Sequence, residues 1–198
     1  MFRDKRLEIN IFMGFSMLPN ALSILRIILT VPIVIALLKE QYFLVMVLFF
    51  SAGVTDALDG WLAKQFSLQS RLGSILDPMA DKILLTCTFV TLYWIDILPL
   101  WLLLLIFFRD LIIVAATVGY FLGQETSETE RLQPTWISKL NTVLQIILVL
   151  FLVLAQLQDG LIVWFEVAFI VVATSTALSG ADYMWLWVRQ FILQEAKK

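Results

Sequence analysis

The feature that most limits how this chain can fold is a series of six long apolar stretches. Most of them reach the about 20 residues that a helix needs to cross a bilayer. A segment inside lipid must satisfy its own backbone polar groups, and these stretches lack the period-two alternation of barrel strands. We therefore predict an all-α integral membrane protein with six transmembrane helices, over residues 17–38, 42–58, 74–95, 98–122, 136–156 and 161–188.

The composition supports this class of protein. Hydrophobic residues make up 61% of the 198 residues and charged residues only 15%. In a typical soluble domain, about 45–50% of the residues are hydrophobic and about 25% are charged. The length fits one domain, and we expect a single membrane domain over 1–198. The second stretch turns polar from Thr55 onward, so we expect its helix to continue past the membrane surface to about Gln65.

Residue counts exclude several kinds of chemistry. The chain has no His, so no imidazole can act as a base or bind a metal. The single Cys87 cannot form an intrachain disulfide or a four-ligand zinc site, and it lies in an apolar run where we expect it to pack. The net charge of −2 gives no footprint for nucleic acid.

Basic residues predict the orientation in the membrane. They gather on one side of the predicted spans, and Lys39 is the one that we assign to the other side. Because cytoplasmic loops carry an excess of Lys and Arg, we predict that both termini are cytoplasmic. We expect residues 1–15 to lie on the inner surface as an amphipathic helix, with Leu7, Ile11 and Phe15 on one face. The alternative is a frayed terminus.

The most informative stretch is residues 55–82, which we interpret as the catalytic motif region. Asp56 and Asp59 are three residues apart and share one helix face, while Asp77 and Asp81 are four apart and share another. The intervening loop is short, so we expect antiparallel neighbouring helices whose four carboxylates converge at the inner edge of the bundle. Such clustered anions are costly, and hard divalent cations prefer carboxylate oxygen. The cluster therefore predicts two divalent cations, Mg²⁺ or Mn²⁺, that clamp a phosphoryl group.

Small residues lie beside these carboxylates. Gly60 follows Asp59, Ala63 is one turn further on, and Gly73 precedes Asp77 by four. They leave open volume where a base and a ribose could approach the backbone. The alternative is that they merely let helices pack closely. Beside four aspartates we favour the ligand interpretation.

This region resembles the signature of the CDP-alcohol phosphatidyltransferase family, through the run Asp56-x2-Asp59-Gly60-x2-Ala63-Lys64-x8-Gly73-x3-Asp77-x3-Asp81. Lys64 stands where the family usually has Arg, and Lys lacks the bidentate fork that Arg offers to phosphate. Shorter motifs extend the resemblance. Residues 19–26 resemble the family's opening helix, and Arg109-Asp110 and residues 134–142 resemble its cardiolipin synthase branch.

The resemblance implies a six-helix membrane enzyme, a homodimer, with a polar cavity open to the cytoplasm. It implies that Asp56, Asp59 and Asp77 are metal ligands, and that Asp81 lies at the metals and is the catalytic base. It also implies a binding site for the CDP-linked lipid, with cytidine and ribose beside the small residues and Lys64 at the diphosphate; its residues are Gly60, Ala63, Lys64 and Gly73. We expect the bacterial inner membrane as its location.

The reaction that we expect is attack of an alcohol on the lipid-side phosphorus of CDP-diacylglycerol, with release of CMP. Since the chain has no His, a carboxylate is the natural acceptor of the hydroxyl proton. The first expectation for the acceptor is phosphatidylglycerol, which gives cardiolipin. The alternative is sn-glycerol 3-phosphate, which gives phosphatidylglycerophosphate.

Cations within or near the spans are candidates for binding the acceptor, and they are Arg26, Arg71, Arg109 and Lys139. Each has a structural alternative. Arg109 could pair with Asp110, although consecutive helical residues point in different directions. Lys139 could extend toward lipid headgroups, Arg26 could have a partner in the bundle, and Arg71 could serve only as a topology charge.

Two other classes of protein compete with this interpretation. Membrane prenyl transferases also use Asp-rich helices and Mg²⁺, but their two motifs lie on distant helices, whereas Asp59 and Asp77 are only 18 residues apart. A cation channel or transporter could use the aspartates as an ion site, but it leaves the spacing of Gly60, Ala63 and Gly73 unexplained.

Overall fold

The structure is a computed structural model of the chain. It describes residues 23–66, 73–123, 136–158 and 160–195, and within these ranges it describes 56–66, 73–78, 115–123 and 186–195 by backbone alone. The statements below concern these residues. The predicted surface helix at 1–15 and Arg71 lie outside them.

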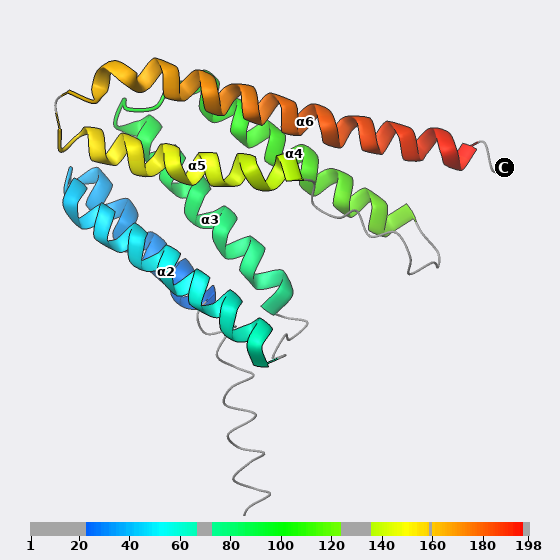
Figure 1. The fold of residues 1–198 in the computed structure, drawn as a ribbon, viewed down its shortest axis with the longest axis horizontal. Coiled ribbons are helices and arrows are strands. Elements are labelled where there is room, and N and C mark those ends of the chain that lie inside the picture. The colour runs from blue at the N-terminus through cyan, green and yellow to red at the C-terminus, as the bar shows by residue number, and fades with distance from the viewer. Residues whose placement is uncertain (1–22, 67–72, 124–135, 159, 196–198) are drawn as a thin grey trace, which may run out of the picture. The chain divides into compact units, whose positions relative to one another are not determined.

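Helices make up the secondary structure of the described residues, as predicted (Figure 1). The first described helix is Ser23–Leu38. It is followed by α2 (Tyr42–Phe66), α3 (Gly73–Trp94), α4 (Leu100–Gly123), α5 (Trp136–Ala155), the short 3-10 helix η1 (Ile162–Trp164) and α6 (Phe165–Glu195). The expected continuation of the second helix to about Gln65 is confirmed, because α2 ends at Phe66.

The chain divides into two compact units, Met1–Ile95 and Asp96–Lys198. The first unit contains the Ser23–Leu38 helix, α2 and α3. In the second unit, α6 packs against both α4 and α5. Apolar residues of these three helices are buried, among them Leu102, Ile106, Leu148, Leu152 and Val172. The polar residues of the second unit are therefore held between three helices.

Two of the described helical segments are long and apolar enough to span a membrane, Trp136–Ala155 and Ile162–Trp185. The segments Ser23–Leu38 and Tyr42–Thr55 are apolar but shorter. The described part of the chain thus contains six α-helices, while six transmembrane spans stay a prediction.

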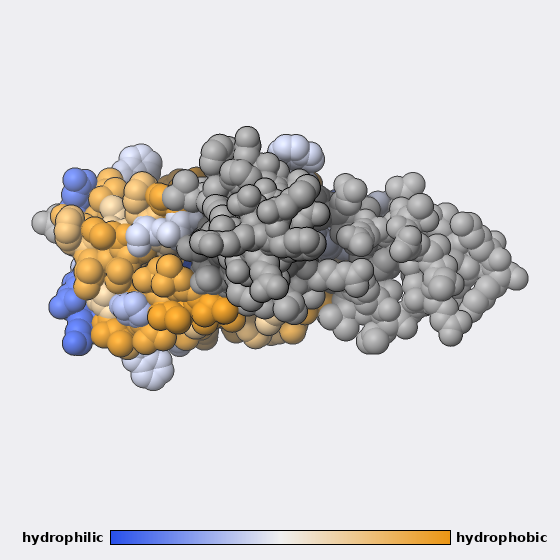
Figure 2. Space-filling view, turned by 90° about the horizontal axis from the view of Figure 1, so that it is seen from below, coloured by the Kyte–Doolittle hydropathy of each residue, from blue (hydrophilic) through white to orange (hydrophobic). Residues whose placement is uncertain are grey.

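Large apolar side chains cover much of the described surface. On the face in Figure 2, most of the surface that is not grey has the colour of hydrophobic residues. Phe43, Phe50 and Trp185 are each about 70% exposed, at 73%, 69% and 69%. Apolar exposure on this scale marks a surface that contacts lipid or another protein rather than water. It fits the family of membrane proteins that the sequence predicts.

The first helix ends on a strained residue. Glu40 has a φ of 56°, in the left-handed region that favours Gly. Its N–H donates to the carbonyl of Leu37 at 2.9 Å, and the N–H of Gln41 donates to the carbonyl of Ala36 at 2.9 Å. These two bonds form a Schellman motif, whose left-handed residue is usually Gly.

Replacing Glu40 with Gly is expected to raise the free energy of unfolding by about 0.5–1 kcal/mol. The substitution removes the steric cost of a left-handed L residue, and the larger backbone entropy of Gly in the unfolded chain offsets part of that gain. Glu40→Ala keeps the Cβ and is the matched control, with little change expected. Thermal unfolding in detergent measures both. If the Gly variant is no more stable than the Ala variant, the backbone at Glu40 is not strained.

Candidate functional site

The carboxylate motif lies on α2 and α3, as predicted. The end of α2 carries Asp56, Asp59, Gly60, Ala63 and Lys64, and α3 begins at Gly73 and carries Asp77 and Asp81. Asp81 is the one aspartate of the four whose side chain is described. Among the side chains that the structure describes, no group of three or more acidic or Cys residues could hold a metal. The convergence of the four carboxylates therefore stays a prediction.

The guanidinium of Arg26 forms an ion pair with Asp81, which joins the first helix to α3. The bond runs from Nη1 of Arg26 to Oδ1 of Asp81. Arg26 is 2% exposed, whereas the side chain of Asp81 is 45% exposed. The buried guanidinium of Arg26 thus holds one carboxylate oxygen of Asp81, the predicted base. Solvent or a ligand can still reach the rest of that carboxylate. A partner in the bundle is the structural alternative for Arg26 that the sequence left open, and Asp81 is such a partner.

The donor chemistry at this place fits a hard divalent cation. A carboxylate oxygen is the kind of ligand that Mg²⁺ and Mn²⁺ prefer, and Asp81 supplies one. The exposed fraction of the Asp81 side chain leaves it accessible.

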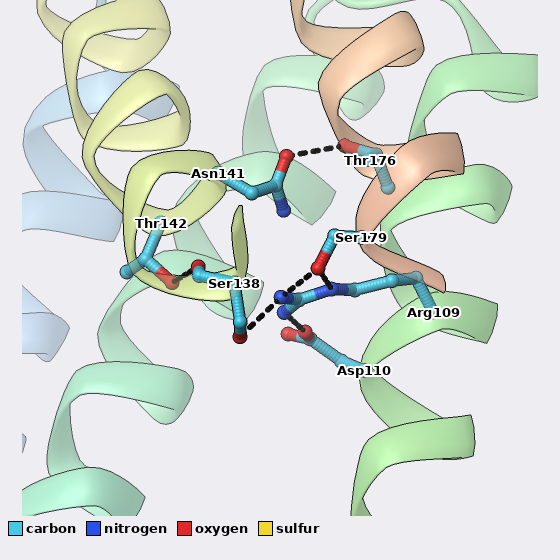
Figure 3. Close-up of polar contacts among 7 residues, drawn as sticks. All are labelled: Arg109, Asp110, Ser138, Asn141, Thr142, Thr176 and Ser179. Carbon is cyan, nitrogen blue, oxygen red and sulfur yellow. Dashed lines mark hydrogen bonds and ion pairs between the residues drawn. The ribbon is translucent and has the colours of Figure 1, made fainter. Parts of the chain in front are cut away.

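A second polar cluster lies in the other unit, where Arg109 of α4 contacts α5 and α6 (Figure 3). Arg109 is 5% exposed. Its Nη2 donates to Ser138 Oγ and to Ser179 Oγ, each at 2.7 Å, and its Nε donates to Ser179 Oγ at 3.2 Å. Its Nη1 donates to Asp110 Oδ1 at 2.7 Å. The guanidinium thus connects three helices and is balanced by one carboxylate.

The pairing of Arg109 with Asp110 corrects the argument that neighbouring helical residues point too far apart to meet. The Cα–Cβ bonds do diverge, but the long side chain of Arg109 bends back far enough to reach the adjacent carboxylate. The serines on α5 and α6 hold the other side of the guanidinium. A structural role for Arg109 is therefore present in the fold, and its predicted contact with the acceptor is untested.

The polar cluster continues one turn along α5. The hydroxyl of Thr176 on α6 donates to Oδ1 of Asn141 at 2.9 Å. Asn141 and Gln145 are both buried, and among the described residues their amide nitrogens have no hydrogen-bond partner. Ser138, Asn141 and Gln145 share one face of α5 because they are three and four residues apart. The helical spacing of these three polar residues in an apolar segment is a signal in the sequence that indicates this polar face, which was not among the predicted site residues.

The remaining acceptor candidate with a described side chain is Lys139. It is exposed at the start of α5, and its Nζ lies 5.6 Å from the centroid of the Trp136 ring. A cation over an aromatic face at this distance is a weak attraction. Lys139 is thus available to a headgroup, and the structure holds it only loosely.

Comparisons with known proteins agree with the motif. The family model for CDP-alcohol phosphatidyltransferase matches residues 16–173. Cardiolipin synthase (CMP-forming) of Homo sapiens is 38% identical over 147 residues, which are 67% of this chain and 48% of that protein. The enzyme of the same name from Streptomyces coelicolor is 39% identical over 103 residues, 47% of this chain and 46% of that protein.

A relative with the other acceptor in its name matches more of both chains. The CDP-diacylglycerol--glycerol-3-phosphate 3-phosphatidyltransferase of Haemophilus influenzae is 29% identical over 189 residues, 91% of this chain and 93% of that protein. The chain spans about half the length of the cardiolipin synthases that it matches. The family model covers well over half of the chain and includes the whole aspartate motif. This protein therefore belongs to the CDP-alcohol phosphatidyltransferase family.

Proposed function

We propose that the protein transfers a phosphatidyl group from CDP-diacylglycerol to phosphatidylglycerol, giving cardiolipin and CMP. The observation that carries this proposal is the 38% identity to a cardiolipin synthase across 67% of the chain. The Arg109-Asp110 and 134–142 motifs, which resemble the same branch, support it.

In the proposed reaction, the hydroxyl oxygen of the acceptor forms a bond to the lipid-side phosphorus. The bond from that phosphorus to the bridging oxygen breaks, and CMP leaves with the electron pair. Asp81 takes the hydroxyl proton, for which an ionised and accessible carboxylate is needed; its partner Arg26 and its 45% exposed side chain support this role. Divalent cations, bound by Asp56, Asp59, Asp77 and Asp81, would supply positive charge to the phosphoryl oxygens.

The CDP-lipid and the acceptor would be held by different residues. We propose that Gly60, Ala63 and Gly73 line the cytidine and ribose site and that Lys64 lies at the diphosphate, from their places in the family motif. Of the cations proposed for the acceptor, Lys139 has the most accessible described side chain, whereas the nitrogens of Arg109 already bind Asp110 and two serines. We further propose a homodimer in a bacterial inner membrane with its active site on the cytoplasmic side.

Phosphatidylglycerophosphate synthesis from sn-glycerol 3-phosphate is the second candidate function. The match that covers 91% of this chain and 93% of the Haemophilus influenzae enzyme favours it. Glycerol 3-phosphate carries nearly two negative charges, and phosphatidylglycerol carries one. The two functions share the donor and the metal chemistry, so only the acceptor separates them.

The test is purified protein with CDP-diacylglycerol and Mg²⁺, given each acceptor in parallel. We expect CMP release and cardiolipin with phosphatidylglycerol, and no release above background with glycerol 3-phosphate. Asp59→Asn protein provides the background. Rapid CMP release with glycerol 3-phosphate and none with phosphatidylglycerol would establish the second candidate instead.

A further inference from the structure

The ion pair between Arg26 and Asp81 has a role that none of the family motifs assigns. Arg26 is fully enclosed, at 2% exposed, and its partner is the proposed base and metal ligand of the neighbouring helix. A buried guanidinium without a counter-ion costs several kcal/mol. The first helix and α3 are thus coupled through the aspartate that we propose as the base.

The geometry limits what each partner can do. The side chain of Arg26 is anchored by burial, since the residue is 2% exposed. The guanidinium therefore stays where the fold puts it, and Asp81 is the partner that must adapt. Because Nη1 of Arg26 engages Oδ1 of Asp81, the carboxylate is fixed in orientation before any substrate binds.

The charge of Arg26 has a second consequence. A cation beside a metal ligand repels a divalent ion that the same carboxylate would attract, and this repulsion falls slowly with distance at a partly buried site. Arg26 therefore holds Asp81 in place and at the same time weakens its attraction for a metal.

We propose that Arg26 is the positioning residue of Asp81, and that it trades metal affinity for a fixed orientation of the base. This inference rests on the proposed function, since it takes Asp81 as a base that lies at the metals. It differs from the sequence-based assignment of Arg26 to the acceptor. The acceptor would then be recognised without Arg26.

The first measurement is Mn²⁺ binding to the purified full-length protein, without CDP-lipid or acceptor, followed by electron paramagnetic resonance. Arg26→Gln removes the charge and is expected to tighten Mn²⁺ binding about 10-fold, through loss of the repulsion. Arg26→Lys keeps the charge and should bind Mn²⁺ like the wild type. Thr30→Val, a buried change on the same helix, is the matched control and should leave affinity unchanged. Unchanged or weaker binding in Arg26→Gln would overturn the proposal.

The second measurement separates positioning from acceptor binding. Arg26→Gln should lower kcat at least about 10-fold and leave KM for the acceptor nearly unchanged, because the base loses its orientation while the acceptor keeps its contacts. A raised KM with unchanged kcat would return Arg26 to the acceptor site. Mn²⁺ affinity is measured without any substrate. The inference therefore stands even if phosphatidylglycerol is not the acceptor, and the acceptor assay is unaffected if Arg26→Gln does not change Mn²⁺ affinity.

Stability provides a check that needs neither metal nor substrate. Asp81→Asn should lower the melting temperature by about 5–10 °C, because it removes the negative charge that pairs with the buried guanidinium of Arg26 in this contact. Adding Arg26→Gln to Asp81→Asn should recover most of the loss. Glu166→Gln, which neutralises an exposed carboxylate at the start of α6, is the control. Additive effects of Arg26→Gln and Asp81→Asn would show that the two residues are not coupled and would overturn the proposal.

Discussion

Replacing Asp56, Asp59 or Asp77 with Asn is expected to leave less than about 1% of the wild-type rate of CMP release. Each substitution removes one negative charge and one oxygen ligand from the proposed metal site, and losing a single stabilising group at a phosphoryl or acyl transfer site costs about 10²–10³ in rate. Release of CMP from CDP-diacylglycerol, followed by chromatography, measures the effect. Glu166→Gln is the matched control, because Glu166 is an exposed carboxylate at the start of α6.

Metal removal tests the same assignment without a mutation. Activity should vanish in excess chelator and return with Mg²⁺ or Mn²⁺. If the wild-type protein turns over fully in chelator, or if the three Asn variants are as active as Glu166→Gln, the aspartates do not hold a metal needed for the reaction.

Replacing Arg109 with Leu is expected to lower the free energy of unfolding by about 3 kcal/mol or more. The change removes an ion-pair partner of Asp110 and the donor that bonds to both Ser138 and Ser179. Breaking a largely buried pair on one side is far more costly than replacing both partners. The variant should melt about 6–12 °C below the wild type. Lys139→Leu is the matched control, since it removes an exposed cation from the same unit.

Arg109→Lys separates the structural role from a role in acceptor binding. Lys keeps the charge but cannot reach Asp110 and both serines with one planar group. We expect intermediate stability. An Arg109→Leu protein that melts with the wild type, yet shows a raised KM for the acceptor, would show that the contacts in Figure 3 contribute little and that Arg109 serves the substrate.

The helices could be predicted because each is a long apolar run, and such runs leave few alternatives in lipid. The polar end of α2 was also predictable, since Asp56 and Asp59 keep a helical spacing beyond the apolar part. The prediction ended the last helix at 188, whereas α6 continues to Glu195. Hydropathy marks where an apolar run ends, and a helix can continue into water with polar residues.

The contacts within the candidate site were harder to predict. Arg26 and Asp81 are 55 residues apart, and Arg109 and Ser179 are 70 apart. Neither separation leaves a periodic trace in the sequence. The cost of burying a guanidinium predicts that a partner exists, but only the packing of the helices selects which one. The Ser138, Asn141 and Gln145 stripe, in contrast, follows helical spacing and predicts a polar face on α5.

The link between Arg109 and Ser179 also bears on how the chain is made. Ribosomes synthesise α4 well before α6, so Arg109 is made at a time when its partner on α6 does not yet exist. An unbalanced guanidinium in lipid is costly. During biosynthesis, Arg109 then depends on Asp110 and on Ser138 of α5 until α6 arrives. The contacts of the Arg109 guanidinium are therefore completed only by the last helix, which supplies Ser179.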